Sequence, residues 1–454
     1  MLRHSFVNPV LRMFWICSCK MPTISFPRFQ RLQSFIWVFT SSPFFLLFIF
    51  SSNLDHDYLS TTLSSWQLNT TRNLRFPAHT VPLPDPLRVW IIESTGSHDE
   101  VRAALVHSFG GLDHGEMTMF RLMDRFDIPD IMDNFTMEAP VKSTRGSQVF
   151  EHAVHELPLP HVVVSTTCEA DLKELAEPMQ FLLANSSAHL FCTIHHADHW
   201  VKGRHVEVAR EWVEKGRIDF LGLSKHTVDY FVRKVATQWD SRTPFKARAY
   251  PPLFPIQLPE SEAGTVDLAM QGDYSPSRRN YRSIFKGLGQ VVSKVEEYGQ
   301  NETVALRLLG HGKKPKVPAR IKNHVVFDES LSYPDFYSRR STSFAVLPAF
   351  ASSDYLDRKA SSTIPAALIA GAPVLADEQL LASYTYLPKE AVWMMKPGET
   401  EMMAMARLVG HRDEYRRKRE ACRMAAKDLM EANRRNVRKW VTEASWKSKW
   451  IEDR

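Results

Sequence analysis

The chain of 454 residues is too long for one ordinary hydrophobic core, so we expect at least two domains. Its 44% hydrophobic and 24% charged residues are typical of a globular protein. The net charge of +6 does not indicate a nucleic-acid partner, because residues 1–52 contain five basic residues and no acidic residue.

The N-terminal residues carry the pattern of a membrane anchor. Residues 34–52 (SFIWVFTSSPFFLLFIFSS) are uncharged and long enough to cross a bilayer as a helix. All five basic residues precede this stretch, so we expect residues 1–33 to be a cytosolic tail and the bulk of the chain to be lumenal. A cleaved signal peptide is the alternative, because Pro43 and its serine neighbours interrupt the stretch. We favour a single-pass type II membrane protein of the Golgi or the endoplasmic reticulum.

Glycosylation sequons and cysteines bear on the same location. Four Asn-X-Ser/Thr sequons follow the apolar stretch and none precedes it, which favours a lumenal glycoprotein; they begin at Asn69, Asn134, Asn185 and Asn301. The five cysteines do not indicate a disulfide framework. Cys168 and Cys192 lie in apolar, strand-like runs, and we expect them to be free buried thiols.

The first predicted domain follows a stem. Residues 53–86 cannot bury enough apolar area to order themselves and are expected to form that stem. From residue 87 onward, short apolar runs alternate with amphipathic segments, as in a parallel sheet with crossover helices. We expect strands at 87–95, 161–167, 188–194, 218–223 and 245–250. Ser97 and Glu100 have the spacing of a capping box at the first helix. A Rossmann-like, doubly wound domain is predicted over residues 87–255.

A second domain of the same class is predicted after a linker. Residues 251–264 (PPLFPIQLPESEAG) are proline-rich and then polar, which is typical of an interdomain connection. The alternation then restarts, with strands expected at 266–272, 303–310, 324–330, 343–350, around 374 and at 390–398. We therefore predict an α/β protein with two Rossmann-like domains, the second over residues 265–400. Residues 401–454 are expected to form a solvated helical tail anchored by tryptophans.

The loops that follow strands in the second domain carry residues suited to binding an anion. Ligands of doubly wound sheets bind at the carboxyl ends of the strands, and two such domains would face each other across a cleft. Gly272 allows a tight turn after the first strand, and Arg279 and Lys286 follow on the next predicted helix. His311 lies between two glycines after the second strand. Each feature is common alone, but they recur at successive loops of one domain.

The stretch RKASSTIPAALIAGAPVLAD, residues 358–377, adds a further anion-binding feature. Lys359 precedes a predicted helix N-terminus that is rich in hydroxyl groups, at Ser361, Ser362 and Thr363. Free backbone N–H groups at a helix N-terminus attract negative charge. Together with the preceding loops, this segment could hold a diphosphate.

In its order of elements, the second half of the chain resembles a known family. From VDLAMQGDYSPSRRNYRSIFKGL through VALRLLGHG and AVLPAF to IPAALIAGAPVLAD, residues 265–445 are similar to the nucleotide-sugar domain of GT-B glycosyltransferases, especially those of group 1. The resemblance implies transfer of a sugar from a nucleotide-diphosphate donor to a glycan, glycoprotein or lipid acceptor, with no cofactor. It also implies that Arg279 and Lys286 meet the diphosphate and that residues 361–363 cap it.

One departure from this family keeps an alternative open. Many group-1 enzymes carry two carboxylates before the glycine of this motif, and alignment on Gly371 places Arg358 and Ala366 at those positions. Asp354 and Asp357 lie nearby and could substitute. The donor contacts must otherwise differ, or activity has been lost. A catalytically silent GT-B-like binding protein is therefore the alternative function.

Histidines provide the candidate chemistry of the first domain. His98 follows the first predicted strand, and His195 and His196 follow another, where a histidine could deprotonate an acceptor hydroxyl or contact a donor phosphate. Asp198 and His199 lie close by in sequence and would allow a metal-dependent lumenal hydrolase, which we consider the less favoured alternative. We predict His98, His195 and His196 as catalytic residues and assign no metal.

Overall fold

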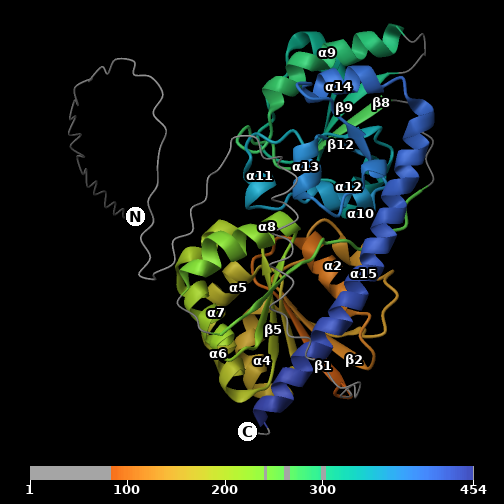
Figure 1. Ribbon diagram of the computed structural model, residues 1–454. Coiled ribbons are helices and arrows are strands. Elements are labelled where there is room, and N and C mark those ends of the chain that lie inside the picture. The colour runs from red at the N-terminus through yellow and green to blue at the C-terminus, as the bar shows by residue number, and fades with distance from the viewer. Residues whose placement is uncertain (1–82, 240–242, 260–265, 298–302, 453–454) are drawn as a thin grey trace, which may run out of the picture. The chain divides into compact units, whose positions relative to one another are not determined.

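The computed structural model describes residues 83–239, 243–259, 266–297 and 303–452 (Figure 1). The predicted cytosolic tail, the membrane anchor at 34–52 and nearly all of the stem lie outside these ranges. Within them, none of the helices combines the length and the apolar character that crossing a membrane requires.

The first sheet is parallel and doubly wound, as the sequence predicts. Its strand order is β3-β2-β1-β4-β5-β6-β7, so the chain starts in the middle, winds to one edge and returns to pair β4 with β1. Every residue of β4, β5 and β6 is buried, as expected for parallel strands covered on both faces. The strands are β1 (Leu87–Glu93), β2 (Gly115–Arg121), β3 (Val141–Gly146), β4 (Val162–Ser165), β5 (His189–Ile194), β6 (Ile218–Gly222) and β7 (Lys246–Ala249).

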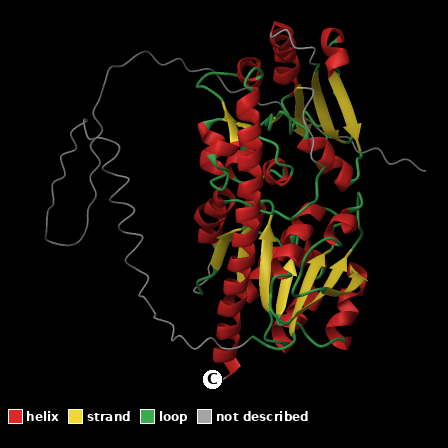
Figure 2. Ribbon diagram, turned by 90° about the vertical axis from the view of Figure 1, so that its right-hand side faces the viewer, coloured by secondary structure: helices red, strands yellow, loops and turns green. Residues whose placement is uncertain are grey.

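Helices connect these strands and flank the sheet (Figures 1 and 2). They are α2 (Asp99–Phe109), α3 (Ile128–Met132), α4 (Phe150–Glu156), α5 (Cys168–Glu174), α6 (Ala176–Asn185), α7 (Arg204–Glu214) and α8 (Lys225–Tyr230). Shorter turns are η1 (Ser147–Val149), η2 (Ala197–Val201), η3 (Phe231–Val235) and η4 (Ala236–Gln238). The switch point of the sheet lies between β1 and β4, which is where doubly wound folds place their ligands.

The second sheet is also parallel, with strand order β10-β9-β8-β11-β12-β13. Its strands are β8 (Val266–Gln271), β9 (Val304–Gly310), β10 (Val325–Glu329), β11 (Ala345–Val346), β12 (Val374–Ala376) and β13 (Val392–Met394), which confirms all six predicted strands. The helices are α9 (Tyr281–Glu297), α10 (Tyr333–Ser341), α11 (Asp354–Asp357), α12 (Thr363–Ile369), α13 (Glu378–Ser383), α14 (Glu401–Leu408) and α15 (Arg412–Glu452). The turns are η5 (Ala319–His324) and η6 (Lys389–Ala391).

In the first domain, two strands were missed and one local prediction was wrong. The strands β2 and β3 were not predicted, because β2 (GEMTMFR) mixes polar with apolar residues and β3 (VKSTRG) is polar after Val141. The capping box does not form, since His98 occupies the N-cap of α2 in a left-handed conformation, with φ 61°. Glu100 instead accepts a hydrogen bond from the Tyr337 hydroxyl of the second domain, at 2.6 Å.

The C-terminal helix α15 is not a solvated tail. It packs against α12 and η6 of the second domain and against α2 of the first, and it runs beside both sheets (Figure 2). Trp440 is buried, with the guanidinium of Arg248 stacked 4.9 Å from its ring centroid. Cys422 is a free buried thiol that donates to the Ala391 carbonyl at 3.3 Å. The helix therefore belongs to the core that both domains share.

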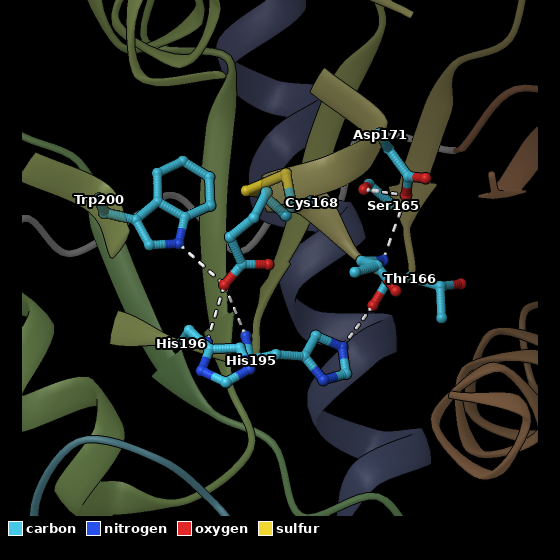
Figure 3. The surroundings of a disulfide bond; sticks show 10 residues. Ser165, Thr166, Cys168, Asp171, His195, His196 and Trp200 are labelled. Carbon is cyan, nitrogen blue, oxygen red and sulfur yellow. Dashed lines mark hydrogen bonds between the residues drawn. A yellow bond between two sulfur atoms is a disulfide. The ribbon is translucent and has the colours of Figure 1, made fainter. Parts of the chain in front are cut away.

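The prediction of free thiols at Cys168 and Cys192 was wrong, because the two form a disulfide (Figure 3). Cys168 begins α5 just after β4, and Cys192 lies in the neighbouring strand β5. The register of the sheet pairs Ser165 with Cys192, which brings the two sulfur atoms together. The bond joins the first residue of α5 to β5, next to the loop that carries His195 and His196.

Candidate functional site

Two predicted catalytic histidines meet at the carboxyl ends of the first sheet. His98 follows β1 and His195 follows β5, and their ring centroids are 3.8 Å apart. Their strands flank β4, so both loops open at the switch point of the sheet. His98 keeps solvent-accessible surface although protein atoms surround its ring, whereas His195 is buried. The structure therefore brings together side chains that are far apart in the sequence.

Hydrogen bonds to Glu169, at the start of α5, and to Thr166 hold the loop containing His195 (Figure 3). One carboxylate oxygen of Glu169 accepts hydrogen bonds from the backbone N–H groups of His195 and His196, at 2.8 and 2.9 Å, and from the indole of Trp200 at 3.0 Å. The Nε2 atom of His195 lies 2.8 Å from the Thr166 carbonyl. A carbonyl only accepts, so Nε2 carries the proton and Nδ1 is the nitrogen that can accept one.

Burial and neighbouring charges keep the other two histidines neutral. The pKa of His98 lies well below its ordinary value, because protein atoms crowd the ring and because His195, His196 and Arg278 disfavour a positive charge. Burial likewise lowers the pKa of His196 to about 4. A neutral imidazole can hydrogen bond to a hydroxyl or accept a proton, but it offers no positive charge to a phosphate. Of the two predicted roles, the chemistry therefore favours hydroxyl contact.

The second domain contributes a loop pair built around two glycines. Gly272 has φ 118°, and Gly310 approaches it so closely that an added Cβ would lie 2.0 Å from the Gly272 carbonyl oxygen. Asp273 pairs with Arg278 at 2.8 Å and with His311 at 3.2 Å. These contacts hold the loops after β8 and β9 together. They also place Arg278 where its charge acts on His98 of the first domain.

Arg279, a predicted diphosphate ligand, is buried and hydrogen bonded within the second domain. Its Nε donates to the Gln271 carbonyl at 2.8 Å and its Nη2 to the Thr363 hydroxyl at 3.0 Å. Its guanidinium also stacks on Phe350 and Tyr355. In this arrangement Arg279 supports the loops, whereas its neighbour Arg278 is exposed.

The predicted hydroxyl-rich segment is part of the same network. Ser361 is buried, and its N–H donates to the Tyr384 hydroxyl at 2.9 Å. Ser362 is exposed and accepts from the Gln271 side chain at 3.2 Å. Arg340, which the sequence did not indicate, is fully buried and donates to the side chain of Gln271 and, at 2.7 Å, to the Thr363 carbonyl. Of the three hydroxyl residues, only Ser362 is exposed to solvent.

Lys359 lies where the two domains touch. Its backbone forms a bridge with His196, and its carbonyl lies 2.9 Å from Nε2 of His226 in α8. Nδ1 of the same imidazole lies 2.9 Å from the Ser383 carbonyl. The Lys359 side chain is partly exposed and pairs with Asp354 at 3.6 Å. The predicted donor residue and the predicted catalytic residue His196 are thus direct neighbours.

Two carboxylates lie near this site: Asp354 forms ion pairs, and Glu401 is surrounded by protein atoms that raise its pKa. Asp354, a suggested substitute for the missing carboxylate pair, is engaged by Arg358 at 2.8 Å as well as by Lys359. Glu401 begins α14 and accepts from the Ala349 N–H at 2.8 Å; burial raises its pKa to about 7, although Arg279 counteracts this. Nothing in the sequence around Glu401 distinguished it from an ordinary residue in the first turn of a helix.

Lys286 was also predicted to bind the donor, but it forms no hydrogen bond or ion pair with the other predicted donor residues in the described part of the chain. It is exposed on α9, and its carbonyl accepts from Arg320 at 3.3 Å. His196, Asp198 and His199, in contrast, bring potential metal-ligand atoms within 4.8 Å of one another. The structure thus separates Lys286 from the histidine loop and assembles a possible metal-ligand set within that loop.

Comparison with known proteins shows a shared fold. Alr3699/HepE from Anabaena, solved in complex with UDP and glucose, is similar with a TM-score of 0.52 and 11% sequence identity, over 79% of this chain and 100% of that chain. Its structure in complex with UDP-glucose gives a TM-score of 0.52 and 12% identity, over 78% of this chain and 98% of that chain. No family model and no curated protein matches the sequence. The chain therefore has the GT-B fold of two Rossmann-like domains.

Proposed function

We propose that the chain is a glycosyltransferase that moves a sugar from a nucleotide-diphosphate donor to an acceptor. The observation that carries this proposal is the meeting of His98, His195 and His196 of the first domain with Arg278 and Lys359 of the second. In a doubly wound fold these positions, at the carboxyl ends of the strands, are where ligands bind. The likeness to a protein solved with UDP-glucose supports a nucleotide sugar as the donor.

The charges around the site suggest which residues bind the diphosphate and which contact the sugar or the acceptor. Arg278 and Lys359 supply positive charge for the diphosphate, which leaves as an anion when the sugar is transferred. His98 is neutral and suits a hydrogen bond to a sugar hydroxyl or removal of a proton from the acceptor. The His195 ring lies against that of His98, with an angle of 36° between the ring planes. The second domain would then bind the donor, and the first would bind a glycan, glycoprotein or lipid acceptor.

We also propose that the protein works in the lumen of the secretory pathway as a type II membrane protein. The Cys168–Cys192 disulfide supports this, since such bonds persist in oxidising compartments. The sequon residues Asn134 and Asn185 are exposed, so both are accessible for glycosylation. A mass shift on enzymatic removal of N-glycans from the cellular protein supports lumenal exposure, and unmodified Asn134 and Asn185 would contradict it.

Nucleotide binding tests the donor site. Thermal unfolding of the full-length chain is followed with nucleoside diphosphates and nucleotide sugars, with and without EDTA. A ligand at about a hundred times its dissociation constant adds roughly 2.7 kcal/mol of stability, which shifts the midpoint. Arg278→Gln and Lys359→Gln should reduce the shift, and Lys286→Gln tests the remaining predicted contact. Arg282→Gln, on the exposed face of α9, is the matched control.

The silent binding protein remains the alternative, because Arg358 and Ala366 stand at the family's carboxylate positions. A silent protein would show the nucleotide shift without consuming any nucleotide sugar. A glycosyltransferase would consume one donor and release its nucleoside diphosphate. The absence of any nucleotide shift, combined with a loss of stability in EDTA, would instead favour the metal-dependent hydrolase.

A further inference from the structure

The loop after β5 places three potential metal ligands side by side. They are His196, Asp198 and His199, and one ligand atom from each lies within 4.8 Å of the others. Two imidazole nitrogens and a carboxylate oxygen form a ligand set that zinc accepts, with a fourth position left for water. This cluster shares His196 with the proposed transfer site and extends beyond the His98–His195 pair.

Two of these side chains have buried polar atoms that lack a partner. Nδ1 of His196 and Oδ1 of Asp198 have no hydrogen-bond partner within the described part of the chain. Buried polar atoms are almost always satisfied by protein, water or an ion. The rings of His196 and His199 lie parallel, with centroids 4.6 Å apart. His199 is exposed, so its ring can rotate to direct a nitrogen at a shared ion.

Surrounding contacts orient the cluster. The carboxylate of Glu169 holds the His196 backbone N–H at 2.9 Å. Arg358 of the second domain lies 3.1 Å from Oδ2 of Asp198, which leaves Oδ1 for another partner. The Ala197 N–H donates to the Arg358 carbonyl at 3.3 Å. Outer contacts of this kind commonly fix the orientation of metal ligands.

We propose that His196, Asp198 and His199 bind one divalent zinc ion. The ion would coordinate Nδ1 of His196 and Oδ1 of Asp198, the two buried atoms without a partner. It would thereby restrict the motion of the loop after β5, next to the backbone bridge between His196 and Lys359 at the boundary of the two domains. The positive charges of Arg358 and Lys359 oppose a cation, which makes this a weaker site than a four-ligand structural zinc site. The proposal does not depend on glycosyl transfer, because it concerns ligand geometry alone.

Equilibrium dialysis against zinc chloride, followed by elemental analysis, tests the proposal on the full-length chain without a histidine tag. The wild-type chain should retain one zinc per chain, and its thermal unfolding midpoint should rise with zinc. His196→Ala and Asp198→Asn should each lower the zinc affinity at least tenfold and abolish the rise. His205→Ala is the matched control, because His205 is only partly buried and contacts the same loop through the His199 carbonyl at 3.1 Å.

The folded state of each variant is checked by circular dichroism and by its unfolding midpoint in EDTA, which should match the wild type in EDTA. Zinc retention equal to the wild type in both His196→Ala and Asp198→Asn would overturn the proposal. So would the lack of stoichiometric zinc in the wild-type chain. A loss of zinc in His205→Ala equal to that in His196→Ala would show adventitious binding to surface histidines and would also overturn it.

Discussion

The hydrogen bond between Tyr337 and Glu100 joins α10 of the second domain to α2 of the first, at 2.6 Å. Tyr337→Phe keeps the ring and removes only the hydroxyl. The Tyr337 side chain is 0% exposed, so water cannot replace the lost donor. Removing one partner of a buried hydrogen bond costs about 1–3 kcal/mol, and we expect the free energy of unfolding to fall by about that amount at pH 7.

The same substitution should alter the dependence of stability on pH. Burial raises the pKa of Glu100, while the hydrogen bond from Tyr337 lowers it. A carboxyl whose folded-state pKa is raised stabilises the fold fully below its unfolded pKa, and this contribution is lost as pH rises through the folded pKa. Removal of the hydroxyl raises that pKa further. Tyr337→Phe should therefore lose more stability at pH 7 than at pH 5.

Urea unfolding at both pH values, followed by tryptophan fluorescence, provides the measurement. Tyr333→Phe is the matched control in the same helix, because the Tyr333 hydroxyl makes no hydrogen bond to any described residue, while its ring centroid lies 6.4 Å from that of Tyr337. Equal losses in the two variants, or a loss in Tyr337→Phe that does not change with pH, would refute the reasoning.

Three other predictions concern the site and its supports. His98→Ala should lower the rate of sugar transfer by about 10²–10⁴-fold without changing the unfolding midpoint, whereas the exposed His152→Ala should keep the wild-type rate in the same assay. Burial raises the pKa of Glu401 to about 7, so part of the stability should be lost as pH rises from about 5 to 8. Glu401→Gln should flatten this loss in urea unfolding, and the exposed Glu390→Gln should not. Cys168→Ser should lower the unfolding free energy by about 2–4 kcal/mol, and a reducing agent should destabilise the wild type but not the variant; equal sensitivity would contradict a disulfide.

The two strands that were not predicted, β2 and β3, have a mixed or polar local sequence. The strands β8 and β9 are apolar runs bounded by glycine or polar residues, and their positions were predicted from that pattern. In contrast, β2 (GEMTMFR) mixes polar with apolar residues, and β3 (VKSTRG) has no buried residue. Only pairing with β1 and with each other makes them strands. That information is tertiary and is not contained in the local pattern.

The candidate site was predictable as a set of loops but not as a set of contacts. His98 and His195 were predicted because each follows an apolar strand, yet the contact between their rings depends on the order of strands in the sheet. Arg279 and Arg278 are adjacent in sequence, and the pattern could not show that Arg279 turns inward to Thr363. The Cys168–Cys192 bond was missed for the same reason, because it requires the β4–β5 register.

The most direct test of the proposed function is turnover of the donor. The full-length chain is incubated with a panel of nucleotide sugars, and the release of nucleoside diphosphate is measured for the wild type, His98→Ala and His152→Ala. We predict that the wild type and His152→Ala consume one donor and that His98→Ala does so far more slowly. If a nucleotide binds but no donor is consumed, the protein is a silent GT-B-like binder. If none binds and none is consumed, the account of a nucleotide-sugar site is contradicted.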